Sequence, residues 1–369
     1  MARSSKQVAE PQERGLVVAV DLRDPKRPLE PELAEYEALI RAAGATLVGR
    51  IVQRLDGIDP ATMLGSGKAH EIANVAKELD ATTLFVFNDL RPRQRTNLAK
   101  IVPIAIVDRT SVILDIFAQR ARSREGKLQV ELAQLRHSQA NLIGSNTELS
   151  RLGGGVGTRG PGETKLEVDR RRIQARISLL REQLEDVRRA RETRRAPSGS
   201  IPLVALVGYT NVGKSSLLNR LSHAQGDTGA FVADQPFATL DPTLRRVYLE
   251  PNLYVRLADT VGFITDLPKE LVNAFRATLE ELEQADVLVH VLDASNPDWP
   301  RQRTSVEGIL HELKLDAKPT VLAFNKSDVR DAQAGPLPPG AIAISARTGE
   351  GLEQLRAAIA ASLAASAHA

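Results

Sequence analysis

One short segment carries glycines, a lysine and a serine at a spacing suited to phosphate binding. It reads Gly208-x-x-x-x-Gly213-Lys214-Ser215, the Walker A pattern, and lies between an apolar run and an amphipathic stretch. The glycines allow backbone N–H groups to turn inward around a β-phosphate, and the following helix N-terminus adds positive potential. Lys214 is predicted to reach the β- and γ-phosphates as a catalytic group, and Ser215 to ligate Mg²⁺. The residues predicted to line this loop are Gly208, Tyr209, Thr210, Asn211, Val212, Gly213, Lys214, Ser215 and Ser216.

A second phosphate-site segment, Asp259-Thr260-Val261-Gly262, follows the apolar run YVRLA. A strand ending here would deliver the Asp259 carboxylate to the Mg²⁺ shell. The Gly262 N–H could then meet the γ-phosphate, which makes Gly262 a catalytic candidate. The next residue is Phe263, where Ras-like enzymes have the glutamine that orients water. An apolar side chain cannot position a nucleophile, so hydrolysis is expected to be slow unless another residue or a partner completes the site.

Two later segments predict selectivity for guanine. Asn325-Lys326-Ser327-Asp328 ends a predicted strand, and the Asp328 carboxylate can accept bonds from guanine N1–H and N2–H₂, a donor pair that adenine lacks. Ser345 and Ala346 follow the last predicted strand, which would bring the Ala346 N–H to guanine O6. The predicted base-contacting residues are Asn325, Lys326, Asp328, Ser345 and Ala346. Together the four segments resemble the translation-factor-related class of P-loop GTPases, which implies binding of GTP and GDP and Mg-dependent hydrolysis of GTP.

The threonine that would sense the γ-phosphate lies in FATLDPT, residues 237–243, which offers Thr239 and Thr243. PFATLDPT resembles the switch loop of related GTPases. On that resemblance Thr239 is the predicted Mg²⁺ ligand and catalytic residue, with Phe237 and Ala238 also beside the nucleotide. Asn211 resembles the asparagine of GTPases that bind potassium beside the phosphates, where the ion replaces an arginine finger. K⁺ is therefore a second candidate cofactor.

Periodic patterns around these motifs predict an α/β fold in three parts. Short apolar runs first alternate with helical patterns, which predicts a parallel α/β domain. An antiparallel two-helix hairpin with a Gly-rich loop then precedes a P-loop GTPase domain, whose mostly parallel sheet is flanked by helices. The predicted parts are a disordered tail (1–14), the N-terminal α/β domain (15–109), the hairpin (110–196) with its loop (151–163), a linker (197–200) and the GTPase domain (201–365).

The hairpin is predicted from two long helical patterns. The first is expected to be one unbroken helix from about Thr110 to Leu142, because Gly126 is its only breaker. The second is expected from about Thr164 to Arg195. It repeats apolar residues at 4-3-4-3 spacing, typical of a coiled-coil seam. The seam consists of Ile173, Ile177, Leu180, Leu184 and Val187.

Composition and charge narrow the class of protein. Hydrophobic residues make up 42% of the 369 residues and cysteine is absent, which predicts a folded protein without disulfides in a reducing compartment. No apolar run approaches the ~20 residues that span a bilayer, so no membrane association and a cytoplasmic location are expected. Residues 91–195 hold 23 Lys and Arg against 12 Asp and Glu. This basic middle favours a polyanionic partner, although an arginine-rich solvated helix would give the same charge.

Several segments resemble the HflX family of ribosome-associated GTPases. They are GGGVGTRGPGETKLEVDRRRI (153–173), MLGSGKAHEI (63–72), DTVGFI and FATLDPT. The resemblance covers about residues 15–365 and implies the three-part fold above. It also implies binding to the large ribosomal subunit, with roles in splitting or rescuing ribosomes. GSGK (65–68) lacks the first glycine of Walker A, because position 62 is Thr62, and a turn into a helix is expected there.

A slender glycine-rich hairpin tip could enter an RNA channel, where Arg151, Arg159 and Lys165 would neutralise phosphates. The leading hypothesis is a monomeric GTPase whose nucleotide state controls ribosome binding. An alternative is a GTP-dependent regulator that binds a non-ribosomal RNA or a protein through the same hairpin. A small-molecule kinase is disfavoured by the NKSD motif. Some relatives carry a further domain beyond the last GTPase helix, which ends here near Leu363, so contacts through such a domain are not expected.

Overall fold

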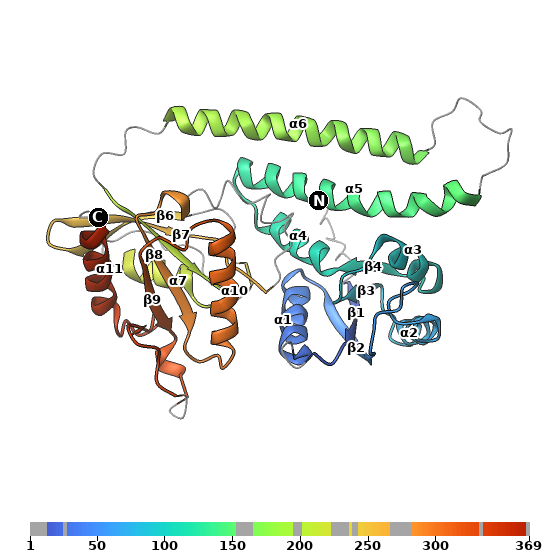
Figure 1. Cartoon of the computed structure of the whole chain (residues 1–369), viewed down its shortest axis with the longest axis horizontal. Helices are drawn as coiled ribbons and strands as arrows, with labels where there is room; N and C mark the ends of the chain where they lie inside the picture. Colours follow the sequence, from blue (N-terminus) through green and yellow to red (C-terminus); the bar gives the residue numbers. More distant parts are fainter. Residues whose placement is uncertain are drawn as a thin grey trace, which may run out of the picture. The chain divides into compact units, whose positions relative to one another are not determined.

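The chain forms two units, each with its own sheet (Figure 1). The computed structural model describes residues 13–24, 28–152, 165–194, 201–222, 236–237, 243–265, 282–331 and 335–366; the side chains of 142–152, 165–166 and 191–194 are not described. The first unit contains Met1–Gln119 and Glu131–Arg181, and the second contains Arg120–Val130 and Glu182–Ala369. The predicted α/β class is confirmed, whereas the predicted domain boundaries stay predictions. Among the described residues, no helix combines the length and apolar character needed to cross a membrane.

The first unit is built on a four-stranded parallel sheet in the order β2-β1-β3-β4. The central strand β1 is buried on both faces, which explains its nearly continuous apolar sequence. Figure 1 shows α1 on one side of this sheet and α2 and α3 on the other. The elements are β1 (Arg14–Asp21), α1 (Leu29–Ala42), β2 (Thr46–Arg54), α2 (Ser66–Glu78), β3 (Thr83–Val86), α3 (Pro92–Ile101) and β4 (Ala105–Asp108). GSGK forms the expected turn into a helix, with Gly65 at φ 88° before α2.

The prediction of one unbroken helix from Thr110 is wrong. The structure has α4 (Arg109–Arg120) and then α5 (Arg124–Leu152). Ser123 ends the interruption, because its Oγ accepts a hydrogen bond from the Gly126 N–H at 2.9 Å and so caps the new helix. The apolar periodicity continues across this break, and no glycine or proline marks it. The sequence pattern therefore did not predict the break.

The helix α6 (Lys165–Arg194) carries the predicted seam. Ile177 and Leu180 are buried, and the other seam residues are half-buried between exposed neighbours. Polar contacts also join α6 to α5: Gln139 Nε2 donates to Gln174 Oε1 at 2.8 Å, and Arg176 lies 2.7 Å from Glu131. The two long helices therefore pair, as the seam predicts.

The second unit is a six-stranded sheet in the order β10-β9-β8-β5-β7-β6, parallel except for the antiparallel pair β6–β7. Helices α10 and α11 lie on opposite sides of this sheet in Figure 1. The strands are β5 (Leu203–Gly208), β6 (Thr243–Glu250), β7 (Leu253–Asp259), β8 (Val287–Asp293), β9 (Thr320–Asn325) and β10 (Ile342–Ala343); the helices are α7 (Lys214–Ser222), α10 (Trp299–Glu312), α11 (Leu352–Ser366) and a short 3₁₀ turn, Ser327–Val329. Because parallel strands end at one edge of a sheet, the loops after β5, β7, β9 and β10 meet there.

Candidate nucleotide-binding site

The loop between β5 and α7 has a backbone that only glycine can follow at two positions. Gly208 has φ 151°, and a Cβ there would lie 2.2 Å from the Val291 carbonyl oxygen. Gly213 has φ 92°, and its Cβ would lie 2.3 Å from Asn325 Nδ2. Both approaches are far below van der Waals contact, so the neighbouring strands dictate glycine. Between them Asn211 takes a left-handed φ of 60°. The loop thus wraps closely enough for backbone N–H groups to surround an anion.

Lys214 begins α7 and is buried. Its Nζ donates hydrogen bonds to the carbonyl oxygens of Gly208 at 3.0 Å and Tyr209 at 2.7 Å. Burial lowers the pKa of Lys214 to about 8, against the opposing effect of the Asp259 carboxylate. A bound anion would stabilise the buried ammonium group and the N–H groups of the loop around it. The phosphates of a nucleotide would supply that negative charge.

Ser215 at the start of α7 and Asp259 at the end of β7 meet at this loop. Ser215 Oγ donates to Asp259 Oδ2 at 2.6 Å, and Thr260 Oγ1 donates to the Leu206 carbonyl at 2.6 Å, which fixes the end of β7 beside β5. Hydroxyl and carboxylate oxygens are hard ligands of the kind that Mg²⁺ prefers. The donor set therefore fits a magnesium ion that takes its remaining ligands from water and phosphate.

The residues after Asp259 approach the loop closely. A Cβ at Gly262 would lie 2.9 Å from Thr210 Cα and 3.2 Å from Lys214 Nζ. Phe263 is buried, and its backbone pairs with the loop: Thr210 N–H donates to the Phe263 carbonyl at 2.8 Å, and Phe263 N–H to the Gly208 carbonyl at 3.1 Å. The Phe263 side chain is thus part of the core and presents no group to orient water.

Asn325 connects the phosphate loop to the base-binding loop. Its buried amide donates through Nδ2 to the Val212 carbonyl at 2.8 Å and accepts from the Ala346 N–H through Oδ1 at 2.9 Å. One side chain at the end of β9 therefore holds two loops that are 134 positions apart in the chain. Both of its bonds are buried, so their loss would leave unsatisfied polar groups.

Asp328 presents a carboxylate held by two neighbours. Its Oδ1 accepts from Ser345 Oγ at 2.7 Å, and Arg347 Nε lies 3.1 Å from Oδ2. The Ser345 bond lowers the pKa of Asp328, and Arg347 acts in the same direction. The carboxylate is consequently ionised at neutral pH, as guanine recognition requires. Arg347 places its N–H groups where the guanine donors would bind, and the sequence motifs did not predict this contact.

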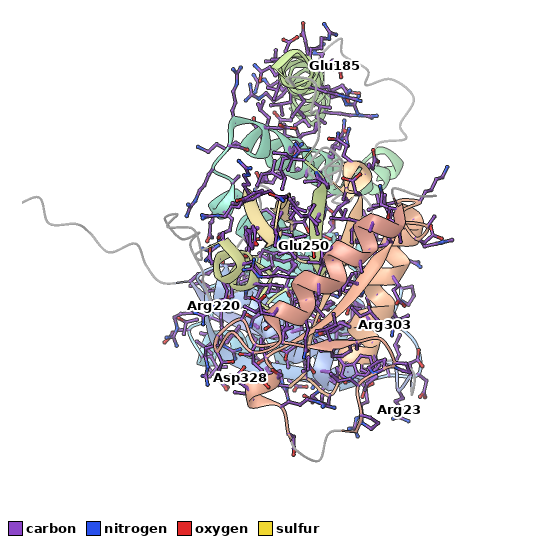
Figure 2. All side chains as sticks on the ribbon, turned by 90° about the vertical axis from the view of Figure 1, so that its left-hand side faces the viewer. Arg23, Glu185, Arg220, Glu250, Arg303 and Asp328 are labelled. Atoms are coloured by element: carbon purple, nitrogen blue, oxygen red, sulfur yellow. The ribbon has the colours of Figure 1, made fainter. Side chains whose placement is uncertain are left out.

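Two further contacts were not predicted. Lys326 Nζ lies 2.7 Å from Asp293 Oδ2 at the end of β8, and Lys326 itself has a left-handed φ of 65°. Arg220 on α7 donates to the Thr348 carbonyl at 3.1 Å. Figure 2 labels Arg220 and Asp328, which lie toward the same side of the second unit. Asp293 directly follows a buried apolar run, and this was the signal available in the sequence.

Not every predicted residue can be placed. Phe237 is described and buried, with φ 55°, whereas Ala238 and Thr239 lie outside the described residues. The alternative switch residue Thr243 begins β6 and pairs with Asp259 across the ladder. The candidate RNA contacts also fall beyond the description: Arg159 lies outside it, as do the side chains of Arg151 and Lys165. Of the remaining predicted nucleotide-site residues, Ser216 lies in α7 and Tyr209, Thr210, Val212 and Val261 lie in the described loops.

Comparison with known proteins places this site in a family. Models described as "GTP-binding GTPase N-terminal", "GTP-binding GTPase Middle Region" and "50S ribosome-binding GTPase" match residues 30–118, 120–197 and 203–326. GTPase HflX of Lacrimispora saccharolytica is 47% identical over 354 residues, covering 95% of this chain and 82% of that protein. GTPase HflX of Escherichia coli is 44% identical over 335 residues, covering 88% and 77%. The chain belongs to the HflX family.

Membership of the HflX family makes the protein a GTPase, an enzyme that hydrolyses GTP on a P-loop domain. P-loop GTPases generally use Mg²⁺. A crystal structure of SsGBP in complex with GDP superposes with a TM-score of 0.50 at 24% identity, covering 95% of this chain and 98% of that one. This likeness supports the fold.

The lowered pKa of Lys214 predicts proton uptake on nucleotide binding. At pH 8.5 most free protein would carry a neutral amine, and bound phosphates would restore the charge, so affinity should fall as pH rises through about 8. Titration calorimetry with GDP at pH 8.5, in two buffers of different ionisation enthalpy, should report uptake of a large fraction of a proton. A Lys214→Arg variant keeps its charge and should take up none. Zero uptake in the unaltered protein contradicts the prediction.

Replacement of Asp328 tests the guanine assignment. In Asp328→Asn an amide replaces an acceptor of two guanine N–H groups, so GDP affinity should fall about 10- to 100-fold, the effect of losing bonds to a charged group. Xanthosine diphosphate, whose C2 carbonyl accepts from an amide, should bind the variant better than GDP. Ser345→Ala, which removes only the hydroxyl on Oδ1, should weaken GDP less and keep the preference for guanine. Unchanged GDP affinity in Asp328→Asn would mean that the motif is misassigned.

Proposed function

We propose that this site binds Mg-GTP with the roles predicted from the sequence, and that its nucleotide state controls binding to the large ribosomal subunit. Lys214 contacts the β- and γ-phosphates, and Ser215 and Thr239 ligate Mg²⁺. The magnesium ion neutralises charge on the β- and γ-oxygens when bound. The observation that carries this assignment is the meeting of Lys214, Ser215 and Asp259 at one loop.

The guanine base would lie between Asp328 and the Ala346 N–H. Asn325 holds the two loops that bear them, and the Lys326–Asp293 pair fixes the segment between. Guanine must displace Arg347 from Asp328 Oδ2, since both present N–H groups to the same oxygen. The base site is therefore ionised before the nucleotide arrives, and Arg347 must move for guanine to bind.

The two-state element is the pair of loops around Thr239 and Gly262. In GTP-bound protein the γ-phosphate and Mg²⁺ hold both, and hydrolysis releases them. Lys214 Nζ lies next to the space beside Gly262, so the phosphate-contacting groups already converge there. Hydrolysis needs a group other than Phe263 to orient water, which makes a low basal rate the expected behaviour.

Potassium dependence tests the role of Asn211, which is exposed at the top of the loop. We expect the GTPase rate in KCl to exceed that in NaCl at equal ionic strength, because K⁺ would supply the positive charge of an arginine finger. Asn211→Ala should remove the difference while GDP affinity stays close to normal. Equal rates in the two salts would exclude the ion.

Several features support a polyanionic partner at the long helices. The exposed surface of α6 carries many arginines, and Arg172, Arg176 and Arg189 among them pair with carboxylates. The exposed arginines are Arg170, Arg171, Arg172, Arg176, Arg181, Arg188 and Arg189. Burial and the neighbouring Arg181 lower the pKa of Arg136 on α5, so positive charges crowd each other where the two helices pair. An RNA backbone would relieve that repulsion. The model described as "50S ribosome-binding GTPase" favours ribosomal RNA over other polyanions.

Co-sedimentation with purified ribosomal subunits tests the partner. With a non-hydrolysable GTP analogue the protein should pellet with the large subunit, and with GDP it should pellet less. Lys214→Ala, which cannot hold the phosphates, should pellet equally in both. A variant lacking residues 153–162 should lose pelleting but keep GDP affinity. Absence of pelleting in either nucleotide state would remove the ribosome and favour another RNA or a protein partner.

A further inference from the structure

The β6–β7 hairpin gathers aromatic and basic side chains on one face. Tyr248 and Tyr254 are paired directly across the strands, with ring centroids 5.5 Å apart at 64°. The Arg246 guanidinium lies 4.2 Å from the Tyr254 ring centroid, and Arg246 is itself opposite Arg256. Two of the four tyrosines in the chain thus meet at one place, beside two arginines.

This face points away from the core of its sheet. Val247, Leu249, Val255 and Leu257 alternate with the tyrosines and arginines and are buried. Helices α7 and α11 pack against β6 on that buried side. On the other face Arg246 is exposed, and Tyr248, Tyr254 and Arg256 are half-exposed. Glu250, labelled in Figure 2, ends β6 at the tip.

The contact of Arg246 with the Tyr254 ring stabilises the hairpin, but it does not remove the repulsion between Arg246 and Arg256. Like charges directly opposite on neighbouring strands destabilise a hairpin. Among the described residues no carboxylate forms an ion pair with Arg246 or Arg256. The hairpin keeps this repulsion next to two partly exposed rings. An anion that also offers flat aromatic faces would neutralise the arginines and stack on the rings.

We propose that the face formed by Arg246, Tyr248, Tyr254 and Arg256 binds single-stranded RNA. Unpaired bases stack on tyrosine rings and on guanidinium planes, and the arginines neutralise phosphates. An acidic peptide would use the arginines but leave the rings without a flat partner. This RNA-binding face is on the GTPase domain and is separate from the α5–α6 hairpin, so it goes beyond the function proposed above.

The position of the face couples RNA to the nucleotide. β6 begins at Thr243, directly after the predicted switch loop, and β7 ends at Asp259, the acid that contacts Ser215. Any shift of these two strands on RNA binding therefore reaches the phosphate site. If RNA binding changes the affinity for nucleotide, linkage requires nucleotide to change the affinity for RNA by the same factor.

A fluorescein-labelled 12-nucleotide oligouridylate tests the proposal by fluorescence anisotropy. The titrations use the full chain and the variant lacking residues 153–162, which removes the loop but keeps the arginines of α6, so the tyrosine variants must assign the signal to this face. Tyr248→Leu/Tyr254→Leu should weaken binding about 5- to 100-fold, the usual effect of losing base stacking, whereas Tyr248→Phe/Tyr254→Phe should bind as the parent does. Arg246→Gln should lower the slope of log affinity against log salt by about 0.7. Unchanged GDP affinity in each variant verifies the fold.

Three results would overturn the proposal. The leucine variants could bind the oligonucleotide as the parent does, or double-stranded RNA could compete as well as single-stranded RNA. The leucine variants could also lose ribosome pelleting while keeping the oligonucleotide, which would assign the face to a ribosomal protein. A protein that binds the oligonucleotide through this face but does not pellet with ribosomes supports the face and contradicts only the ribosomal partner.

Discussion

The nucleotide site depends on the buried amide of Asn325. Its two hydrogen bonds, to the Val212 carbonyl and from the Ala346 N–H, join the phosphate loop to the base loop. A Cβ at Gly213 would collide with the same amide, so the glycine of the phosphate loop is required partly by the base-binding strand. The loop after β5 and the loop after β10 are therefore joined through one side chain.

The charge distribution follows from the same arrangement. Lys214 is buried against carbonyl oxygens and has a lowered pKa, while the carboxylate of Asp328 is kept ionised by Ser345. The buried imidazole of His290 on β8 differs from Lys214, because it stays neutral. Its burial, and then the charges of Arg303 and Lys214, lower its pKa to about 3. The site thus places the Lys214 ammonium at the phosphate end and the Asp328 carboxylate at the base end. A nucleotide complements both in only one orientation.

The sequence predicted those parts of the site whose residues lie at fixed spacing within one segment. Gly208, Gly213, Lys214 and Ser215 form a continuous motif, and the strand patterns place it correctly. Contacts between distant segments were not predictable: the pairs Lys326–Asp293 and Arg347–Asp328 arise only when parallel strands bring their ends together. The break at Ser123 was missed for a different reason. The cap is a local hydrogen bond that competes with helix continuation, and it leaves the apolar periodicity intact.

The β6–β7 hairpin connects an edge of this sheet with the phosphate site. Its buried face consists of Val247, Leu249, Val255 and Leu257. Its ladder joins Thr243 directly to Asp259, next to the phosphate site. Arg246 and Tyr254 lie on the same two strands as Thr243 and Asp259. The β6–β7 ladder thus connects the proposed RNA-binding face with Asp259, the residue that contacts Ser215.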